Sequence, residues 1–146
     1  MELEWMRNVC LAHAARSTAN LVTRHYNRFL APIDLEITQA MLLGLIGAGE
    51  ADSLSELARL LGVDRSTLQR NLKLLEEAGL VNKVRIAPNR IKPELSAAGQ
   101  TKIREASEAW QQAQDSLTAE LGEAGADTIR TQMKTLRKAV HKAGAS

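Results

Sequence analysis

The middle of the chain holds a run of side chains that can hydrogen-bond to the edges of DNA bases. In the major groove, Arg can pair with guanine O6 and N7, and Gln or Asn can pair with adenine N6 and N7. Glu76 and Glu77 come only at the far end of the run, whereas an ordinary surface helix mixes both signs of charge. We therefore predict that this stretch reads the major groove of double-stranded DNA. Its predicted contacts are Arg65, Ser66, Thr67, Gln69, Arg70, Asn71 and Lys73.

Two short helices are expected to present these side chains. A capping box at Ser53 and Glu56 predicts the start of the first helix, and Asp64 is the expected N-cap of the second. Between them, Gly62 allows a positive φ in a tight turn, and Ala58 is small where the two helices would touch. This order of residues is typical of a helix-turn-helix.

A β-hairpin is predicted directly after the second helix. Residues 80–86 alternate apolar and polar side chains, residues 87–90 form a turn, and residues 91–95 return. Pro93 lacks an amide donor, so the returning strand should lie at an edge or be bulged. Such a hairpin makes a winged helix, whose wing lies along the DNA backbone or in the minor groove. The predicted contacts of the wing are Lys83, Arg85, Asn89, Arg90 and Lys92.

The rest of the chain is predicted to be helical. Apolar positions recur every three or four residues from about Asn8 to Leu30, from about Glu36 to Ala48, and again beyond Ser96. The expected fold is mainly α, an α+β winged helix with about six helices and a short β-hairpin wing. The predicted domains are a winged helix-turn-helix lobe at 35–95 and dimerisation helices at 1–34 and 96–146.

Two apolar stripes lack a predicted partner within so short a chain. One lies around Trp5, Met6 and Val9, and the other follows helical spacing near the C-terminus. A twofold dimer would bury both stripes and would place two helix-turn-helix units on half-sites roughly 10 base pairs apart, or a multiple of that. We therefore expect a homodimer. The second stripe consists of Ile129, Met133, Leu136 and Val140.

Charge is concentrated where the DNA contacts are predicted. The chain has 146 residues with 19 Lys and Arg against 17 Asp and Glu, a net charge of only +2. Residues 59–92 hold eight basic and three acidic side chains, which gives +5 there and −3 elsewhere. This distribution favours a module that contacts phosphates. Aromatic residues make up 3% of the chain, which argues against platforms that stack bases.

Several other classes of protein are disfavoured. The sequence has no GxSxG elbow, phosphate-binding loop, HExxH motif or paired carboxylates, so we do not expect an enzyme or a cofactor. An apolar run of roughly 18 residues is absent, and the acidic start lacks the features of a signal peptide. We expect a cytoplasmic protein with no membrane partner. A non-DNA helical dimerisation or interaction protein remains an alternative.

The sequence resembles the multiple-antibiotic-resistance regulator (MarR) family of bacterial winged-helix transcription factors over nearly its whole length. The stretches that carry the resemblance are 14–16, 23–26, 35–39, 64–72, 75–81 and 95–99. The resemblance implies an obligate homodimer, held by the first and last helices, that binds a pseudo-palindromic operator. It also implies a repressor that a small molecule or an oxidant releases from DNA.

The hairpin departs from the family pattern. The family usually carries an Asp-Arg pair there, in which the Asp orients an Arg that enters the minor groove. This chain reads Pro88-Asn89-Arg90 and has a slightly shorter loop. Arg90 is the candidate for the minor-groove residue, and Asn89 can hold it only by a neutral hydrogen bond.

The resemblance places an effector pocket between the first two helices, the long fifth helix and the DNA-binding lobe. One cation amid apolar walls would suit an aromatic or lipophilic carboxylate. The alternative is that these residues are ordinary core, interface or ion-pairing residues. The candidate effector contacts are His13, Arg16, Thr18, Tyr26, Met41 and Trp110.

Cys10 suggests a redox alternative. Organic-hydroperoxide regulators, which are relatives in this family, sense with a Cys near the start of the first helix. Alignment on Thr23 and Tyr26 puts Ala12 at that position and Cys10 two residues earlier. Arg7 and His13 could still lower the thiol pKa, so a sensing role and an inert thiol both stay open. No metal site is expected, because the three His residues form no cluster of ligands.

Overall fold

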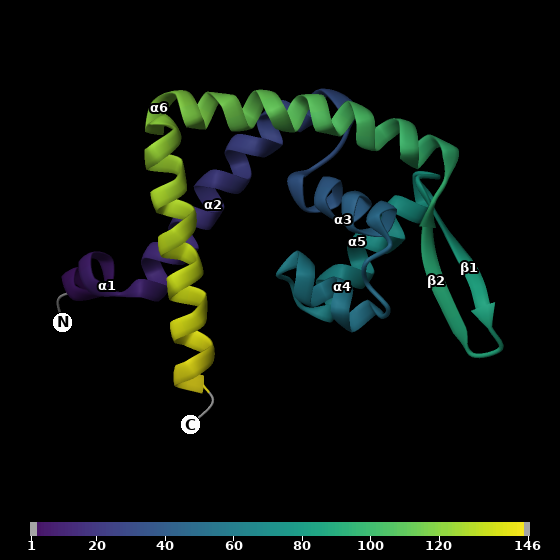
Figure 1. Cartoon of the computed structure of the whole chain (residues 1–146), viewed down its shortest axis with the longest axis horizontal. Helices are drawn as coiled ribbons and strands as arrows, with labels where there is room; N and C mark the ends of the chain where they lie inside the picture. The colour runs from purple at the N-terminus through teal and green to yellow at the C-terminus, as the bar shows by residue number, and fades with distance from the viewer. Residues whose placement is uncertain (1–2, 145–146) are drawn as a thin grey trace. The chain divides into compact units, whose positions relative to one another are not determined.

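A computed structural model describes residues 3–144 of the chain. Six α-helices, one 3-10 helix and one hairpin follow one another within these residues (Figure 1). The elements are α1 (Glu4–Val9), α2 (Leu11–Leu30), η1 (Ala31–Ile33), α3 (Ile37–Ala48), α4 (Leu54–Leu61), α5 (Arg65–Glu77), β1 (Val81–Ala87), β2 (Arg90–Leu95) and α6 (Ala97–Gly144). Residues 1–2 and 145–146, the ends of the predicted dimerisation segments, lie outside the described part.

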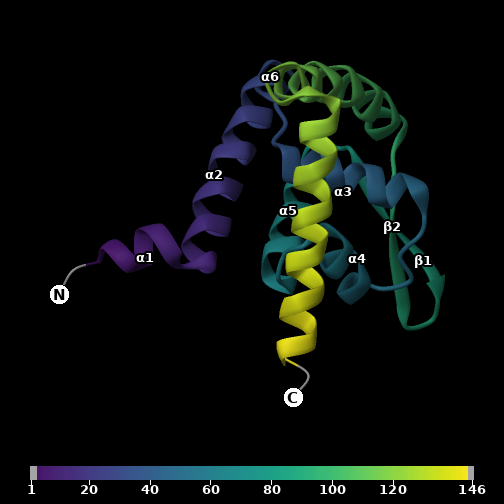
Figure 2. The same cartoon turned by 60° about the vertical axis from the view of Figure 1, so that its left-hand side comes forward.

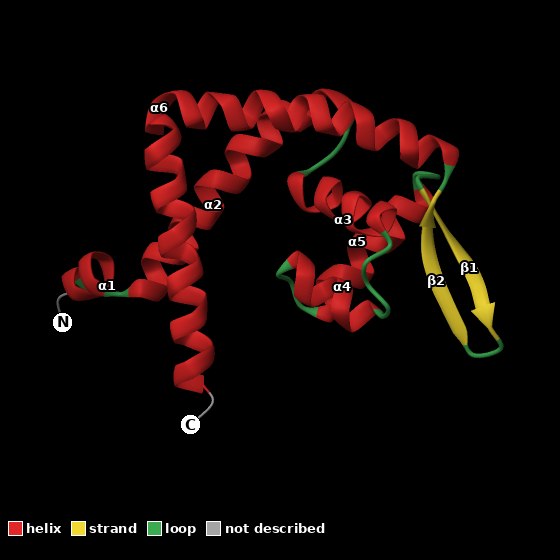
Figure 3. Ribbon diagram, in the orientation of Figure 1, coloured by secondary structure: helices red, strands yellow, loops and turns green. Residues whose placement is uncertain are grey.

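The chain divides into two compact units, Met1–Trp110 and Gln111–Ser146. Helix α6 contributes to both, and its helical backbone is interrupted at Gly122, where φ is 74° and ψ is 159°. Figure 3 shows the helices in red and the two strands of the hairpin in yellow. The predicted fold class, mainly α with a short β-hairpin wing, is confirmed.

The core of the first unit forms around α3, which is apolar on both sides. Leu42 and Leu43 are fully buried there, and Ile46 is nearly so. Leucines of α4 and α5 pack into the same cluster, to which α2 adds Leu30 and α6 adds Ala106. Burial of one such Leu or Ile side chain contributes about 1.5–3 kcal/mol, so this cluster fixes the positions of α4 and α5. Figures 1 and 2 both show α3, α4 and α5 grouped beside the hairpin.

The first predicted helix is interrupted. The sequence predicts one helix from about Asn8 to Leu30, whereas the backbone of Cys10 is extended, with φ −71° and ψ 115°, and separates α1 from α2. Since no Gly or Pro stands near this point and apolar spacing continues on both sides, the interruption carries no sequence signal.

The start of α3 is held by side chains from two elements. The Ile37 amide donates to Oδ1 of Asn27, on α2, at 2.7 Å. The Glu36 amide donates to Oε1 of Gln39 at 3.1 Å. These bonds satisfy amides that the first turn of a helix leaves unpaired, and the Asn27 bond also joins α2 to α3.

The start of α6 makes a close backbone contact with the start of β1. Ser96 donates its hydroxyl to the Gly79 carbonyl at 2.6 Å and accepts from the Gly99 amide at 3.0 Å. A Cβ added to Gly99 would lie 2.0 Å from the carbonyl oxygen of Leu80. Only glycine fits there without moving backbone.

Within residues 3–144, no single helix is long and apolar enough to cross a membrane. The pair Leu11–Ile33 and Ile37–Ala48 passes by length and composition only when taken together, across a 75° bend.

Candidate nucleic-acid interface

The packing of α4 against α5 follows the predicted helix-turn-helix. Ala58 is 6% exposed, and its carbonyl accepts from the amides of Gly62 and Val63 at 2.9 and 3.0 Å. Gly62 has φ 77°, and Leu68 is fully buried beneath the turn. Ala58, Gly62 and Leu68 therefore have the roles that their spacing predicts. The buried face of α5 holds this helix against the core.

Capping at α4 is simpler than predicted. The Ser53 hydroxyl accepts from the Glu56 amide at 3.1 Å, as expected for an N-cap. The Glu56 carboxylate does not accept from the Ser53 amide, as a capping box would require, and instead lies 3.4 Å from the guanidinium of Arg59. The ion pair with the next turn of the helix is favoured because both side chains are on the same helical face.

Asp64 caps the amino-terminal end of α5. Its carboxylate accepts from the Thr67 amide at 2.7 Å and from the Ser66 hydroxyl at 2.8 Å. These hydrogen bonds, that of the Thr67 amide first, hold the pKa of Asp64 below its ordinary value. The first turn of α5 is therefore fixed around an ionised carboxylate, which stabilises a helix at this end.

The face of α5 opposite its buried leucines carries most of the predicted base contacts. Arg65, Gln69 and Lys73 are exposed and follow one another at steps of four residues. Ser66 and Arg70 form a second exposed stripe beside the first. These five positions present donors and acceptors to solvent from a helix whose leucines are packed in the core.

Thr67 and Asn71 are placed differently from the other predicted contacts. Both are half-buried. The Thr67 hydroxyl accepts from Nη2 of Arg70 at 3.3 Å, and Asn71 donates its amide to the Thr67 carbonyl at 3.0 Å. Thr67 therefore orients Arg70 in this structure, and Asn71 is bonded within its own helix.

The hairpin has an antiparallel register with one irregularity. Lys83 pairs with Pro93 and Val84 pairs with Lys92, and a bulge falls between Arg85 and Ala87. Since the sheet has two strands, both are edge strands, which agrees with the prediction for Pro93. Figure 2 shows the hairpin extending from the rest of the lobe.

Two arginines of the hairpin bind carbonyl oxygens. Arg85 donates to the Pro88 carbonyl at 2.6 Å, across the turn. Arg90 donates to the Asp52 carbonyl at 2.6 Å, in the loop before α4, and not to Asn89 as the sequence suggested. The acceptor is a main-chain atom 38 residues away, so side-chain types gave no signal for this contact. A small cavity of about 30 Å³ adjoins it, lined also by Gly49.

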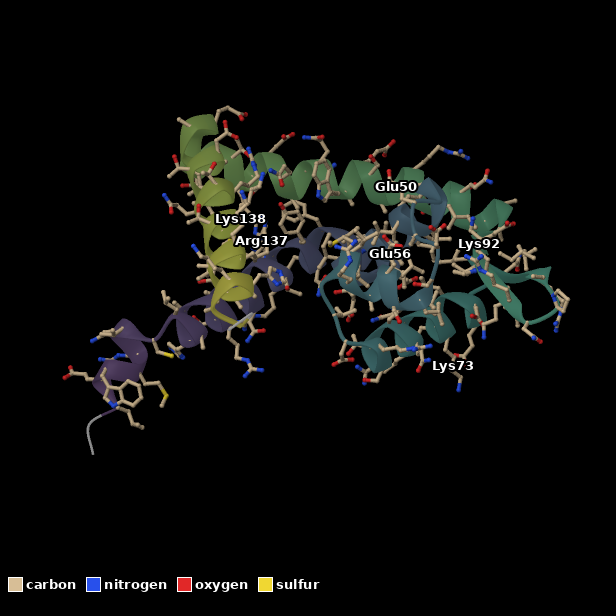
Figure 4. The ribbon with its side chains drawn as sticks, turned by 60° about the horizontal axis from the view of Figure 1, so that its bottom comes forward. Glu50, Glu56, Lys73, Lys92, Arg137 and Lys138 are labelled. Carbon is tan, nitrogen blue, oxygen red and sulfur yellow. The ribbon has the colours of Figure 1, made fainter. Side chains whose placement is uncertain are left out.

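Cationic side chains from α5 and from the hairpin border a common groove. It has a volume of about 540 Å³ and is lined by Lys73, Lys83 and apolar residues that include Leu72. Nζ of Lys83 lies 3.5 Å from the carboxylate of Glu76, a half-buried residue. Lys73 and Lys92 are labelled in Figure 4, on α5 and on the hairpin. Basic groups thus flank α5 on the side of the wing, where DNA phosphates can be neutralised.

The six predicted effector contacts do not meet in one place within the described residues. Met41 and Trp110 line one depression of about 230 Å³, together with apolar side chains such as Ile103. His13 borders a separate surface depression near α1. Arg16 and Thr18 are exposed on α2. Tyr26 is half-buried, and its ring lies edge-on to the His25 ring, with the two ring centroids 5.8 Å apart.

Cys10 is a half-buried free thiol at the junction of α1 and α2. Because it is the only cysteine of the chain, it has no partner for an internal disulfide. Within residues 3–144, no three His, Cys, Asp or Glu side chains come together in a way that could hold a metal ion.

Comparisons with known proteins agree with this geometry. A model of the MarR family matches residues 33–90. The crystal structure of the M. tuberculosis transcriptional regulator MosR is similar to this chain, with 30% identity over 93% of this chain and 98% of that chain and a TM-score of 0.82. The same regulator in complex with DNA matches at 30% identity, 92% and 98% coverage, and a TM-score of 0.79.

A more distant neighbour shares the fold. The transcriptional repressor CouR bound to p-coumaroyl-CoA is 24% identical over 94% of this chain and 97% of that chain, with a TM-score of 0.81. A comparison with curated protein sequences gives no match.

Proposed function

This chain belongs to the MarR family of transcriptional regulators, and we propose that it is a homodimeric repressor that reads a pseudo-palindromic operator through α5. The similar regulator MosR has been crystallised with DNA, which supports a DNA partner for this chain too. The family to which the chain belongs consists of transcription regulators, and we assign this member no catalytic activity and no cofactor. Its proposed place of action is the cytoplasm, where bacterial DNA lies.

The exposed face of α5 is the observation that carries this proposal. Arg65, Gln69, Arg70 and Lys73 point to solvent, while the opposite face is buried through Leu68 and neighbouring leucines. Between Arg65 and Leu75, α5 contains no acidic residue; the first is Glu76. Such a surface suits the negative potential and the acceptor-rich edges of the major groove. The remaining predicted contacts, Ser66, Thr67 and Asn71, support the helix end or orient its neighbours.

The hairpin is proposed to contact the DNA backbone. Lys83, Arg85, Asn89, Arg90 and Lys92 stay the proposed wing contacts. In the free chain Arg90 is bonded to the loop before α4, so its entry into the minor groove would require this bond to open. The ammonium of Lys83 lies at the edge of the groove beside α5, where a DNA phosphate can replace Glu76 as its partner.

Dimerisation is proposed to use segments 1–34 and 96–146. Trp5 is 56% exposed and Val9 is 75% exposed on α1, and Val140 is 62% exposed on α6. Large apolar side chains exposed at helical spacing are typical of surfaces that a partner covers. A second copy would cover them and would supply the second α5 that a twofold operator requires.

The proposed effector is a small aromatic or lipophilic molecule. Met41 and Trp110, which are 47% and 41% exposed, line the apolar depression of about 230 Å³ and are the strongest of the six candidates. Ser107 is the polar side chain of that lining. A ligand lowers operator affinity if it binds more tightly to a conformation in which the two α5 helices of the dimer do not fit the operator. The size of the effect depends on the difference between its affinities for the two conformations. The repressor CouR, crystallised with p-coumaroyl-CoA, offers a structural parallel for a bound aromatic acyl group.

The direct test is recovery of genomic fragments by the purified chain, followed by affinity measurements at several salt concentrations. We expect enrichment of a twofold-symmetric sequence, and log K should fall by about 0.9 per log unit of salt for each phosphate neutralised. The double variant Arg65→Ala/Arg70→Ala, which leaves the buried face of α5 intact, serves as the control that should recover no specific fragment.

Two outcomes would count against the proposal. Recovery of no fragment, with wild-type dimers present, would favour a non-DNA interaction protein. DNA binding that does not change with salt concentration would exclude phosphate contacts by the basic residues of α5 and the wing.

A screen of aromatic carboxylates tests the effector. Each compound is added to the complex of the protein with the recovered DNA fragment, and Trp110→Ala is the variant that we expect to stay bound to the fragment.

A redox-sensing mode of release through Cys10 is the alternative to a ligand. It requires Cys10→Ser to abolish release by a hydroperoxide, and the geometry at Cys10 offers no second thiol within the chain. We therefore propose that a ligand, and not oxidation of Cys10, releases the protein from DNA.

A further inference from the structure

Arg70 differs from the other long polar side chains on the exposed face of α5, because its guanidinium is already held. Among residues 3–144, no side-chain hydrogen bond or ion pair is made by its neighbours on that face, Arg65, Gln69 and Lys73. Nη2 of Arg70 instead donates to the Thr67 hydroxyl at 3.3 Å. A guanidinium is rigid and planar, so a hydrogen bond to one nitrogen restricts the directions of its other donors. The donors of Arg70 are therefore oriented before DNA binds.

Thr67, which holds Arg70, is itself fixed by its surroundings. The residue is half-buried, and Leu68 next to it is fully buried. The Thr67 amide donates to Asp64 at 2.7 Å, and the Thr67 carbonyl accepts from Nδ2 of Asn71 at 3.0 Å. The branched Cβ of a threonine also restricts rotation about χ1. The hydroxyl that accepts from Arg70 therefore has little freedom of its own.

The Thr67 hydroxyl also links Arg70 to the carboxylate of Asp64. The pKa of Asp64 is lowered first by the Thr67 amide and next by the Ser66 hydroxyl, and a hydrogen bond from the Thr67 hydroxyl follows. The positive charge of Arg70 lowers this pKa further. A carboxylate only accepts and a guanidinium only donates, whereas a hydroxyl does both. The hydroxyl of Thr67 therefore donates to Asp64 and accepts from Arg70 within one network.

A similar pair on α6 shows which part of this network is particular to α5. Nη2 of Arg104 donates to the Thr101 hydroxyl at 3.4 Å, again across three residues. The Thr101 hydroxyl donates to the Ala97 carbonyl at 3.3 Å, which is the ordinary bond of a threonine to the preceding turn of its helix. Thr101 is exposed, whereas Thr67 is half-buried. The Arg-to-Thr bond thus occurs on both helices, and the carboxylate behind it occurs in the network of α5.

We propose that Asp64 and Thr67 are positioning residues for base recognition by Arg70, so that the base preference of α5 depends on two side chains that need not touch a base. The bond to Thr67 uses one of the five N–H donors of the guanidinium, and two of the others suffice for a bidentate pair with guanine O6 and N7. A guanidinium held in this way loses less freedom on binding and offers its donors in one direction. The inference rests on the proposed function, in which α5 lies in the major groove.

Thr67→Val tests the network, because it removes the hydroxyl and keeps both the branched shape and the amide that Asp64 caps. Binding of wild type, Thr67→Val and Arg70→Ala is measured against single-base variants of the operator recovered with wild-type protein. A bidentate arginine discriminates between base pairs by roughly 5- to 150-fold. Thr67→Val should lose most of this discrimination at the base pair that Arg70→Ala affects, and at no other position. Thr67→Ser, which keeps a hydroxyl, should retain it.

Two further variants separate positioning from support of the helix. Thr67→Val/Arg70→Ala should discriminate no worse than Arg70→Ala alone, because the hydroxyl acts through Arg70. Asp64→Ser keeps an N-cap acceptor but removes the carboxylate. It should reduce discrimination at the same base pair, while its binding to unrelated DNA should not weaken, since a negative charge has been removed near the phosphates. Unchanged discrimination in Asp64→Ser would overturn the role of Asp64.

The matched control is Thr101→Val, which removes the same kind of bond from Arg104 on α6 and should keep the base preference of wild type. The proposal is overturned if Thr67→Val, with wild-type helix content by circular dichroism, discriminates at every position as wild type does. It is also overturned if Thr67→Val weakens binding to all operator variants by one common factor, as a loss of helix stability would. The DNA-reading role of α5 fails separately, if wild-type protein binds no operator or if Arg70→Ala keeps the wild-type preference.

Discussion

The guanidinium of Arg90 donates a 2.6 Å hydrogen bond to the carbonyl oxygen of Asp52 and so joins the first residue of β2 to the loop before α4. The two residues are 38 positions apart. In the free chain the wing arginine therefore holds the hairpin against the helix-turn-helix. A wing that is already positioned loses less conformational freedom when DNA binds.

Removal of this contact should loosen the hairpin before any DNA is present. Arg90→Ala is expected to raise amide hydrogen exchange in residues 51–54 and 84–92 of the free protein, because the loop and the strand lose their bridge. Arg85→Ala, which loses only the bond to Pro88 within the turn, should leave residues 51–54 unchanged. Equal exchange of residues 51–54 in wild type and Arg90→Ala would contradict the bridging role.

The cap of α5 should make stability depend on pH in the acid range. The pKa of Asp64 is lower in the folded chain than its ordinary value, so its carboxylate stabilises the fold above about pH 3.9. This contribution is lost as the pH falls through that value toward the folded-state pKa. Asp64→Asn keeps a capping acceptor without a titrating group, so its unfolding free energy should fall less between about pH 5 and about pH 3.

Urea unfolding at several pH values measures this difference. Ser66→Ala removes the hydroxyl that donates to Asp64 and should give a pH dependence between those of wild type and Asp64→Asn. Parallel pH profiles for wild type and Asp64→Asn would show that the cap does not couple folding to protonation.

Gly99 should be intolerant of a methyl group. In Gly99→Ala the new Cβ would lie 2.0 Å from the Leu80 carbonyl oxygen, so the first turn of α6 and the start of β1 must separate. We expect a loss of about 1–3 kcal/mol in unfolding free energy. Gly44→Ala, in α3, meets its nearest atom at 3.9 Å and should gain about 0.5–1 kcal/mol. Equal stability of both variants in thermal unfolding would argue against the close contact.

Local sequence signals predicted the helix-turn-helix well. Gly62 in the turn, Asp64 at the cap and the buried Leu68 have the positions that their chemistry requires. The hairpin was also predicted, because apolar and polar side chains alternate along its first strand. Pro93 was placed on an edge strand because it has no amide hydrogen to donate to a neighbouring strand. Each of these signals acts within a few residues of where it appears in the sequence.

Features that depend on distant backbone atoms were not predictable in the same way. The bond from Arg90 to Asp52 has a main-chain acceptor, and the break at Cys10 follows no Gly or Pro. The effector candidates were drawn from several helices, and of these the structure joins Met41 and Trp110. Such contacts depend on how distant parts of the chain pack together, which cannot be deduced from the side-chain types alone.

If α5 reads base edges, the removal of one of its arginines must change the base preference, and a specificity profile of Arg70→Ala measures this change. Binding free energies of wild type, Arg70→Ala and Lys83→Ala are measured against every single-base variant of the recovered operator. We expect Arg70→Ala to lose about 1–3 kcal/mol of binding free energy and to discriminate no longer at one base pair in each half-site, the two being related by the twofold axis. Lys83→Ala should weaken all sequences alike. An unchanged base preference in Arg70→Ala, with affinity reduced uniformly or not at all, would show that α5 does not read base edges through Arg70.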